Sequence, residues 1–324
     1  MTSTAVKALT EERRPAGGRG HRGALPAALV VVYLVWGSTY LALRVGVREL
    51  PPLTLSAARF LFAGLLLYGW CAWQRRRRPL AGWQPPTWRQ WRSSAVLGLA
   101  LPAAGTGGAT WAEQKLPSGT AALLLASIPL WLIIASRVAI GERITRWSGC
   151  GLVLGLAGIV VLANPFASGA EDPIATAVAL AGAMAWGCGS VYAKRAPHPA
   201  QPLLASGMQM ICAGAALAIL AAATGEFGRI HAGSLVSASG LALGYLIVFG
   251  SLLAYSTYEW LVRHAPGTLA GTYAFVNPVV AVLLGWWLLG ERLTARTLIA
   301  TVVIVTGVTL IVASTARRTR ELVC

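Results

Sequence analysis

The chain contains ten apolar runs that are long enough to cross a membrane, and these runs restrict its fold more than any other feature. A helix crosses the roughly 30 Å hydrocarbon layer of a bilayer in about 20 residues. The chain is 56% hydrophobic and 12% charged, with a mean hydropathy of +0.63, so it is far more apolar than a soluble domain. The sequence therefore predicts an all-α integral membrane protein. The ten predicted helices cover residues 26–47, 52–73, 94–112, 118–139, 147–163, 173–193, 201–223, 237–261, 266–289 and 296–314.

Basic residues lie mainly on one side of these runs. With the N-terminus inside, 20 of the 27 Lys and Arg lie in cytoplasmic segments, five lie in outer segments, and two, Arg44 and Arg59, lie within runs. Cytoplasmic loops of membrane proteins carry such an excess, so we expect both termini in the cytoplasm of a multi-pass protein of the cell membrane. The run "RRRR" at 75–78 then anchors the topology. Because the net charge of +16 is spread over helix ends, no nucleic-acid partner is expected.

The segments outside the runs are short. We expect residues 1–24 to form a disordered basic head in the cytoplasm and residues 315–324 to form a cytoplasmic tail. The head does not look like a signal peptide, because the apolar run that follows it is too long. No soluble catalytic domain is predicted.

Two stretches of the chain echo each other. "SIPLWLIIASRVAIGERIT" (127–145) and "VNPVVAVLLGWWLLGERLT" (276–294) share a proline near the start and a Gly-Glu-Arg end, and each matching pair is 149 residues apart. The same offset joins Pro117 to Pro266 and Gly158 to Gly307. The sequence thus predicts two five-helix repeats, over residues 25–164 and 172–314. Because five is odd, the second repeat enters the membrane inverted, which is an architecture of transporters.

Several of these motifs resemble the drug/metabolite transporter superfamily, and specifically its ten-helix exporters with two EamA domains. The resemblance covers about residues 26–314. It implies a central cavity lined chiefly by the first four helices of each repeat, with the fifth and tenth helices packed at the periphery, and export of small metabolites. The motifs are "VWGSTYLALRVGV", "PPLTLSAARFLFAG", "SGTAALLLASIPLW" and the paired "GERIT" and "GERLT" ends.

Pro129 and Pro278 occupy equivalent places in the two repeats. A proline inside a helix removes a backbone hydrogen bond and displaces the carbonyl four residues earlier. We interpret the pair as hinges for alternating access that leave the carbonyls of Leu125 and Ala274 facing a cavity. The alternative is that both are tolerated packing features.

Few ionisable residues lie within the predicted helices. Arg59 is about 10 Å deep, by its seven residues at ~1.5 Å each, so it should face a substrate carboxylate or pair with Glu113. Glu259 is a candidate for proton coupling, with pairing to Arg263 as the alternative. Glu142 and Glu291 end the matching runs, and we interpret both as structural closure residues.

A group of aromatic and polar residues is predicted to line the cavity with few charges. We expect this composition to suit a small amphipathic substrate. With Arg59, the candidates are Trp36, Ser38, Thr39, Tyr40, Trp186, Tyr258, Tyr273 and Asn277.

No pattern of metal ligands, catalytic residues or phosphate-binding glycines is found, so we expect no metal, no cofactor and no enzymatic activity. The favoured function is a secondary active exporter of small amphipathic metabolites, such as amino acids or drug-like compounds, with protons as a candidate coupling ion. The alternative is an exchanger of anionic sugar-phosphates or nucleotide-sugars, and a membrane-bound transferase is the third hypothesis. The expected partners are the small-molecule substrate and the lipid bilayer, and the chain should be a monomer or a weak dimer.

Overall fold

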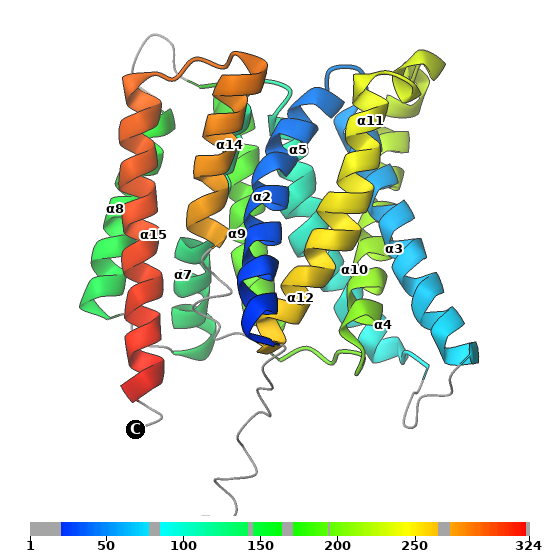
Figure 1. Ribbon diagram of the computed structural model, residues 1–324, viewed down its shortest axis with the longest axis horizontal. Helices are drawn as coiled ribbons and strands as arrows, with labels where there is room; N and C mark the ends of the chain where they lie inside the picture. The colour runs from blue at the N-terminus through cyan, green and yellow to red at the C-terminus, as the bar shows by residue number, and fades with distance from the viewer. Residues whose placement is uncertain are drawn as a thin grey trace, which may run out of the picture.

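The computed structural model describes residues 21–77, 85–141, 145–163, 171–193, 195–264 and 273–321, and these residues form helices joined by short connections, with no β-strand among them. The helices stand side by side as a bundle (Figure 1). Five of them are single α-helices of more than 20 residues: α2 (His21–Gly46), α3 (Pro52–Arg77), α9 (Pro173–Ala193), α10 (Pro202–Ala223) and α15 (Ala295–Glu321). Six helical stretches are long and apolar enough to cross a membrane, and three shorter apolar helices accompany them.

Three stretches of the bundle are built from several helical pieces. The first comprises α4 (Trp88–Gly98), the π-helical η1 (Leu99–Gly107) and α5 (Gly108–Ala112); the second comprises α6 (Ser118–Leu125) and α7 (Ile128–Ile140); the third comprises α11 (Ala238–Tyr245), the π-helical η4 (Leu246–Leu253) and α12 (Ala254–His264). The remaining helices are α8 (Arg146–Ala163) and α14 (Tyr273–Leu289), with the short 3₁₀ turns η2 (Glu226–Arg229) and η3 (Ala232–Leu235) before α11. A wider π-turn places an extra residue in the helix and is frequent at functional sites.

Local sequence signals explain where several helices begin and end. Thr87 precedes α4, and its side chain and that of Gln90 form reciprocal hydrogen bonds with the backbone, which is a capping box. Gly141 follows α7 with φ +74°, and Gly290 follows α14 with φ +66°. This left-handed conformation favours glycine and stops a helix. The two Gly-Glu-Arg motifs therefore begin with the same backbone turn.

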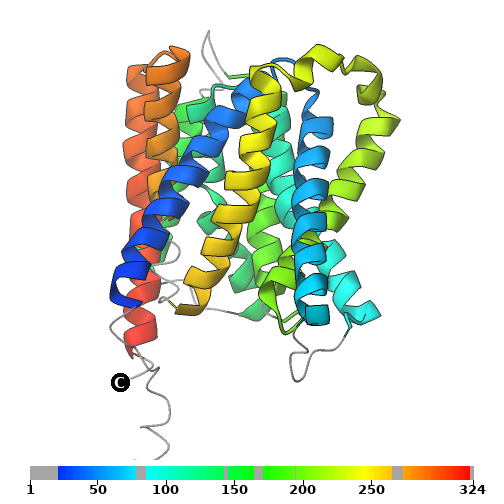
Figure 2. The ribbon, with the colours of Figure 1, turned by 45° about the vertical axis from the view of Figure 1, so that its right-hand side comes forward.

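The tightest helix pairs are α3 with α10 and α8 with α15. Gly64 of α3 faces Gly207 of α10 so closely that a Cβ on Gly64 would lie 2.7 Å from the Ile211 amide nitrogen and 2.9 Å from the Gly207 carbonyl oxygen. Small residues let membrane helices approach in this way. In Figure 2, α15 lies at one edge of the bundle and α3 lies toward the other edge.

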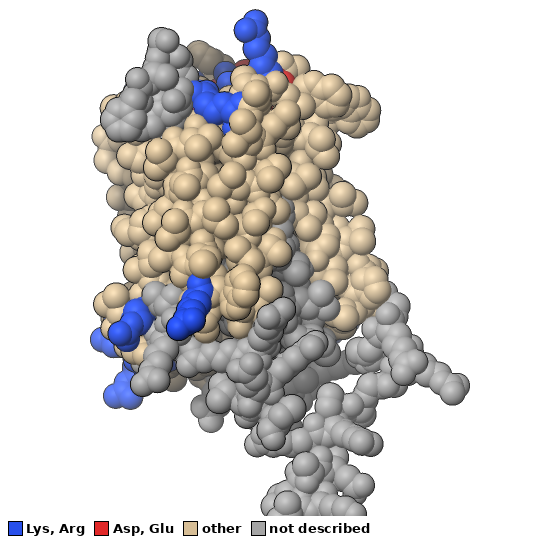
Figure 3. Space-filling view, turned by 90° about the vertical axis from the view of Figure 1, so that its left-hand side faces the viewer, with Lys and Arg blue, Asp and Glu red and all other residues tan. Residues whose placement is uncertain are grey.

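The outer surface carries exposed apolar side chains between two charged ends, as contact with lipid requires. Figure 3 shows the face that includes α8 and α15, where blue Lys and Arg side chains lie at the two ends and a tan band lies between them. Large apolar side chains that are exposed on α8, α14 and α15 include Val153, Trp287, Ile299 and Val302. Exposed apolar side chains over such an area indicate contact with lipid rather than with water.

Several predicted helix boundaries differ from the structure, and two of them also bound the predicted head and tail. The first described helix begins at His21, before the end of the predicted head at residue 24, and α15 continues to Glu321 instead of ending at 314. The extension of α15 agrees with helix propensity, because its Ala and Arg residues favour helix beyond the apolar run. The remaining predicted head residues, 1–20, and the last three residues lie outside the described part of the chain.

Candidate binding cavity

A cavity lies in the middle of the bundle. The space inside it that water-sized molecules can occupy is about 80 Å³, and the empty space around that, open solvent included, is about 680 Å³. Pieces of α2, α3, η1, α5, α6, α7, α9, η4, α12 and α14 form its wall. Neither α8 nor α15 contributes, in agreement with a peripheral position, and α10 is also absent from the lining. The lining residues are Trp36, Thr39, Tyr40, Leu43, Arg59, Phe60, Pro102, Thr106, Ala109, Leu125, Ile128, Trp186, Gly250, Ser251, Tyr255, Tyr273 and Asn277.

Among the lining residues that the structure describes, Arg59 is the one charged residue, and it is 5% exposed. Its Nε donates a hydrogen bond of 2.9 Å to Ser251 Oγ, and its guanidinium lies 5.1 Å from the centre of the Phe60 ring. Its Nη1 has no hydrogen-bond partner within the described structure. A buried guanidinium needs an acceptor for each N–H, so this atom offers an unused donor to a molecule in the cavity.

Asn277 offers a complementary group in the same lining. It lies in α14, is 6% exposed, and its Oδ1 has no partner in the part of the chain that the structure describes. Asn277 also lines a smaller adjoining pocket between Pro129 and Pro278. A ligand with one anionic group and one N–H donor would satisfy Arg59 and Asn277 together.

Aromatic rings form one side of the cavity. The Trp36 ring packs edge-on against Tyr273, with centroids 5.1 Å apart, and it also contacts Tyr255 and Tyr258. The Trp36 Nε1 donates a hydrogen bond of 3.2 Å to the Gly250 carbonyl. Across the cavity the Trp186 ring occupies space beside Gly105, where a Cβ would lie 2.5 Å from the ring. These rings give the cavity a wall that suits apolar parts of a ligand.

The cavity collects seven of the nine residues predicted to line it. The two exceptions lie behind the wall. Ser38 pairs with the Tyr245 hydroxyl at 2.6 Å and with the Leu34 carbonyl, so its side chain is engaged between α2 and α11. Tyr258 packs against Trp36 and Tyr273 and supports them without lining the space. Ser38 and Tyr258 are therefore not among the residues that line the cavity, and a role for them at the binding site stays a prediction.

Sequence reasoning missed the contribution of the π-helical segments. Pro102 and Thr106 come from η1, whereas Gly250 and Ser251 come from η4. The available signal was weak, because a proline or glycine within an apolar run marks an irregular turn but does not say which way it faces.

The two predicted hinge prolines have different surroundings. Pro278 lies inside α14, as expected. Pro129 lies in the first turn of α7, because the predicted continuous helix is divided at Ala126 and Ser127. In a first turn the missing N–H has no partner to lose, so Pro129 starts a helix rather than kinking one.

Of the acidic candidates Glu142, Glu259 and Glu291, only Glu291 has a side chain in the described part of the structure. The Glu291 carboxylate accepts hydrogen bonds of 2.9 Å from both the Ser118 amide and the Ser118 hydroxyl, and one of 3.5 Å from the Gly119 amide. It therefore sits on the N-terminus of α6, where unpaired amides favour an anion. Glu142 lies outside the described residues. Glu259 lies in α12, but its side chain is outside the described part of the structure.

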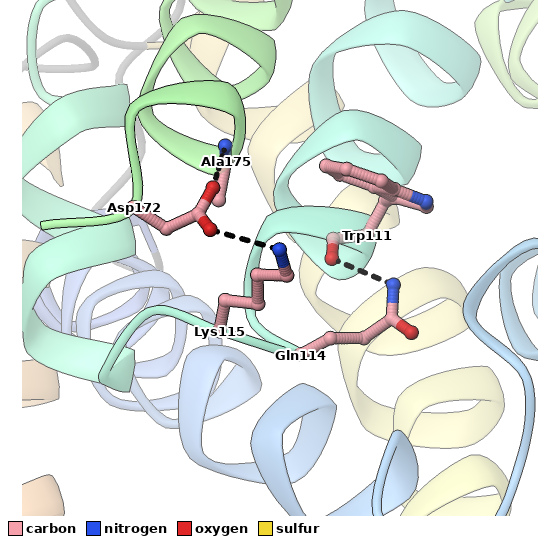
Figure 4. Close-up of polar contacts among 5 residues, drawn as sticks. All are labelled: Trp111, Gln114, Lys115, Asp172 and Ala175. Atoms are coloured by element: carbon pink, nitrogen blue, oxygen red, sulfur yellow. Dashed lines mark hydrogen bonds and ion pairs between the residues drawn. The ribbon is translucent and has the colours of Figure 1, made fainter.

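Arg59 and Glu113 do not form the predicted ion pair. The two ion pairs among the described residues are Lys115 with Asp172, at 2.8 Å, and Arg296 with Glu171, at 3.4 Å. Figure 4 shows Asp172 between the Lys115 ammonium and the Ala175 amide. The hydrogen bond from Lys115 lowers the pKa of Asp172, whereas burial raises the pKa of Glu171. These pairs link the residues just before α9 to the turn that follows α5 and to the start of α15.

A helical membrane bundle around a mixed aromatic and polar cavity is the architecture of a membrane transport protein. Comparison with known proteins agrees. The model of the EamA-like transporter family matches residues 24–164 and again residues 173–313. The chain belongs to this family and carries the family domain twice.

Among similar proteins, the uncharacterized inner membrane transporter YedA of Escherichia coli K12 is 40% identical over 286 residues, covering 88% of this chain and 89% of that protein. An Escherichia coli K12 protein named "Probable amino-acid metabolite efflux pump" is 26% identical over 295 residues, covering 87% and 91%. A protein of known crystal structure shares the fold with a TM-score of 0.60 at 21% identity, covering 90% of this chain and 97% of that one. The chain is therefore a multi-pass membrane protein of a transporter family.

Proposed function

We propose that this protein is a secondary exporter of small amphipathic metabolites, in particular amino acids and related compounds, that works by alternating access at the central cavity. The observation that carries the proposal is the pair of unpartnered groups in the cavity, Arg59 Nη1 and Asn277 Oδ1, beside the aromatic wall. A zwitterion with an apolar side chain matches all three features. The name of the efflux pump relative from Escherichia coli supports the same substrate class.

Alternating access rests on a proposed architecture of ten crossings in two inverted repeats, residues 25–164 and 172–314. Four features support it. The Gly-Glu-Arg motifs share the left-handed glycine, the π-helical segments η1 and η4 occur in corresponding stretches, α8 packs against α15, and α3 packs against α10. Elements related by a pseudo-two-fold axis are expected to pair in this way.

A cytoplasmic position for both termini follows from the same proposal. The N-terminal end of α2 and the C-terminal end of α15 lie on the same side of the bundle in Figure 1. The basic ends of α3 and α15 also lie there, and cytoplasmic segments are the ones enriched in Arg.

Exchange of sugar-phosphates is less favoured by the cavity. A dianionic phosphate calls for several cations, and Arg59 is the one charged side chain among the described residues of the lining. Arg44 donates its hydrogen bond to the Glu113 carbonyl instead.

Counterflow in proteoliposomes tests the substrate class. Proteoliposomes loaded with unlabelled phenylalanine are expected to take up labelled phenylalanine. Proteoliposomes loaded with glucose 6-phosphate should not take up labelled glucose 6-phosphate. Arg59→Gln and Asn277→Leu should each reduce phenylalanine counterflow by about tenfold, because each leaves one ligand group unpaired. Arg229→Gln, a change at an exposed residue of η2, is the matched control. Uptake of the sugar-phosphate without uptake of phenylalanine would reverse the choice of substrate class.

A further inference from the structure

Glu113 carries a buried carboxyl group to which the proposed function assigns no role. It follows the last residue of α5, and its side chain is 0% exposed. Neither Oε1 nor Oε2 has a hydrogen-bond partner within the described structure. It does not line the cavity.

The charged neighbours of Glu113 are already engaged elsewhere. Arg44 of α2 donates to the main-chain carbonyl of Glu113, so its guanidinium lies beside the residue without bonding the carboxyl group. Glu291 acts on Glu113 as a second negative group, but its carboxylate is bound to the start of α6. Lys115, two residues on, is exposed and paired with Asp172.

One further titratable group acts on Glu113 from the cavity wall. Tyr40 of α2 interacts electrostatically with Glu113 and also with Arg59. Arg59 of α3 donates to Ser251 and forms no ion pair with Glu113. The carboxyl group of Glu113 is thus surrounded by polar groups, none of which donates to it in the described structure.

An ionised carboxylate in this position would be strongly destabilised. Burial of an unpaired charge costs several kcal/mol, and a buried group in that situation holds a proton instead. After burial, the nearby Arg44 guanidinium acts in the opposite direction and favours the carboxylate, whereas Glu291 adds a like charge and the end of the helix adds its negative dipole. The neutral carboxyl group is therefore the form compatible with this conformation.

We propose that Glu113 is a proton-binding site of this transporter, which holds a proton while it is buried and releases it when the bundle opens at this end. On opening, the O–H bond of the carboxyl group breaks, the proton passes to water, and the carboxylate that remains pairs with the adjacent Arg44 guanidinium. Closure returns a proton from water to the carboxylate. The part of this proposal that concerns the transport cycle rests on the proposed function, whereas the bound proton itself does not.

Infrared spectroscopy detects the proton directly. The protein in lipid nanodiscs at neutral pH is expected to show the carbonyl stretch of a protonated carboxyl group, and Glu113→Gln should lose this band. Glu226→Gln is the matched control, because Glu226 is also buried but accepts hydrogen bonds from the Thr54 amide and hydroxyl. The control should keep the band. Identical spectra for the wild type and Glu113→Gln would overturn the proposal.

A chemical probe of the wild-type protein covers the case in which Glu113→Gln does not fold. Dicyclohexylcarbodiimide reacts with protonated carboxyl groups in apolar surroundings, and mass spectrometry locates the adduct. Labelling is expected at Glu113 and should fall as the pH is raised. Absence of labelling at Glu113 at every pH, or labelling that does not change with pH, would count against a proton that is bound and released.

The role in the cycle has its own measurement. Accumulation of labelled phenylalanine driven by an imposed pH gradient should be lost in Glu113→Gln and kept in Glu226→Gln. Equal accumulation in Glu113→Gln and the wild type would overturn the role of Glu113 in transport. If neither the wild type nor either variant transports phenylalanine, the transport proposal fails for that compound. The spectroscopic result then still decides whether Glu113 carries a proton.

Discussion

Glu291→Gln removes the negative charge from a carboxylate that joins the end of α14 to the start of α6. The wild-type carboxylate accepts three hydrogen bonds from Ser118 and Gly119. Glutamine keeps one oxygen, so it can replace the bond from one amide, but its NH₂ group then faces the other donors. A hydrogen bond to a charged group contributes about 1.5–3 kcal/mol, and the helix terminus adds about 0.3–1 kcal/mol. We expect Glu291→Gln to lower the free energy of unfolding by about 2 kcal/mol.

Two further variants separate the tether from other effects of the charge. Ser118→Ala removes only the hydroxyl donor and should cost about 1 kcal/mol, and the double variant should lose less than the sum because the two residues share one interaction. Gly285→Ala leaves the carboxylate in the sequence but places a methyl group 2.3 Å from Glu291 Oε2, so it should displace the carboxylate and lower stability to a similar degree.

Thermal unfolding of the purified proteins in detergent gives the stability, and phenylalanine counterflow gives the apparent affinity. The expected pattern is a lower melting temperature in Glu291→Gln with little change in apparent affinity. A variant that melts with the wild type but loses its response to a pH gradient would refute the structural role and would place Glu291 in the coupling mechanism.

Three other changes have expected outcomes. Pro278→Ala restores an amide donor inside α14 and should reduce transport, while substrate binding in detergent survives. Pro129→Ala changes a residue in the first turn of α7 and should alter transport little. Equal loss of counterflow in the two variants would contradict this difference. Gly64→Ala should destabilise the contact of α3 with α10 by about 1–3 kcal/mol, whereas Gly69→Ala, with open space around it, should be neutral or stabilising in thermal unfolding. Because the pKa of Asp172 is lowered in the folded protein, the ionised carboxylate stabilises the fold at pH values above its ordinary pKa of 3.8. This stabilisation is lost as the pH falls through the lower pKa of the folded state. The melting temperature should therefore fall slightly on acid titration of the wild type, and this loss should be absent in Asp172→Asn.

Much of the architecture follows from the sequence because membrane helices obey local rules. An apolar run must hydrogen-bond its own backbone in lipid, which forces helix, and a basic flank fixes which end stays in the cytoplasm. The repeated Gly-Glu-Arg motif also carries its structure locally, since a glycine with positive φ ends both α7 and α14. These features need no knowledge of what lies beside each helix.

The faces of the helices were decided only by the tertiary structure. In a soluble helix an apolar stripe shows which side is buried, but here lipid and protein interior are equally apolar, so the pattern carries little information. On α3, Phe62 and Leu65 face outward and Phe60 and Leu67 are buried, although all four are apolar. The cavity residues were recognisable by their chemistry, yet Ser38 was turned away from the cavity by Tyr245, which is far from it in sequence.

The partners of the ionisable groups depend on the same long-range packing. The sequence determined that Arg59 and Glu113 lie in or beside apolar segments and need partners. Only the packing of α3 against η4 supplied Ser251 to Arg59, and only the approach of α2 to the end of α5 directed Arg44 to the Glu113 carbonyl and left the carboxyl group unbonded. A hydrogen bond requires its two atoms within about 3.5 Å, and for residues more than 60 positions apart that distance is set by how the helices pack, not by the sequence near either residue.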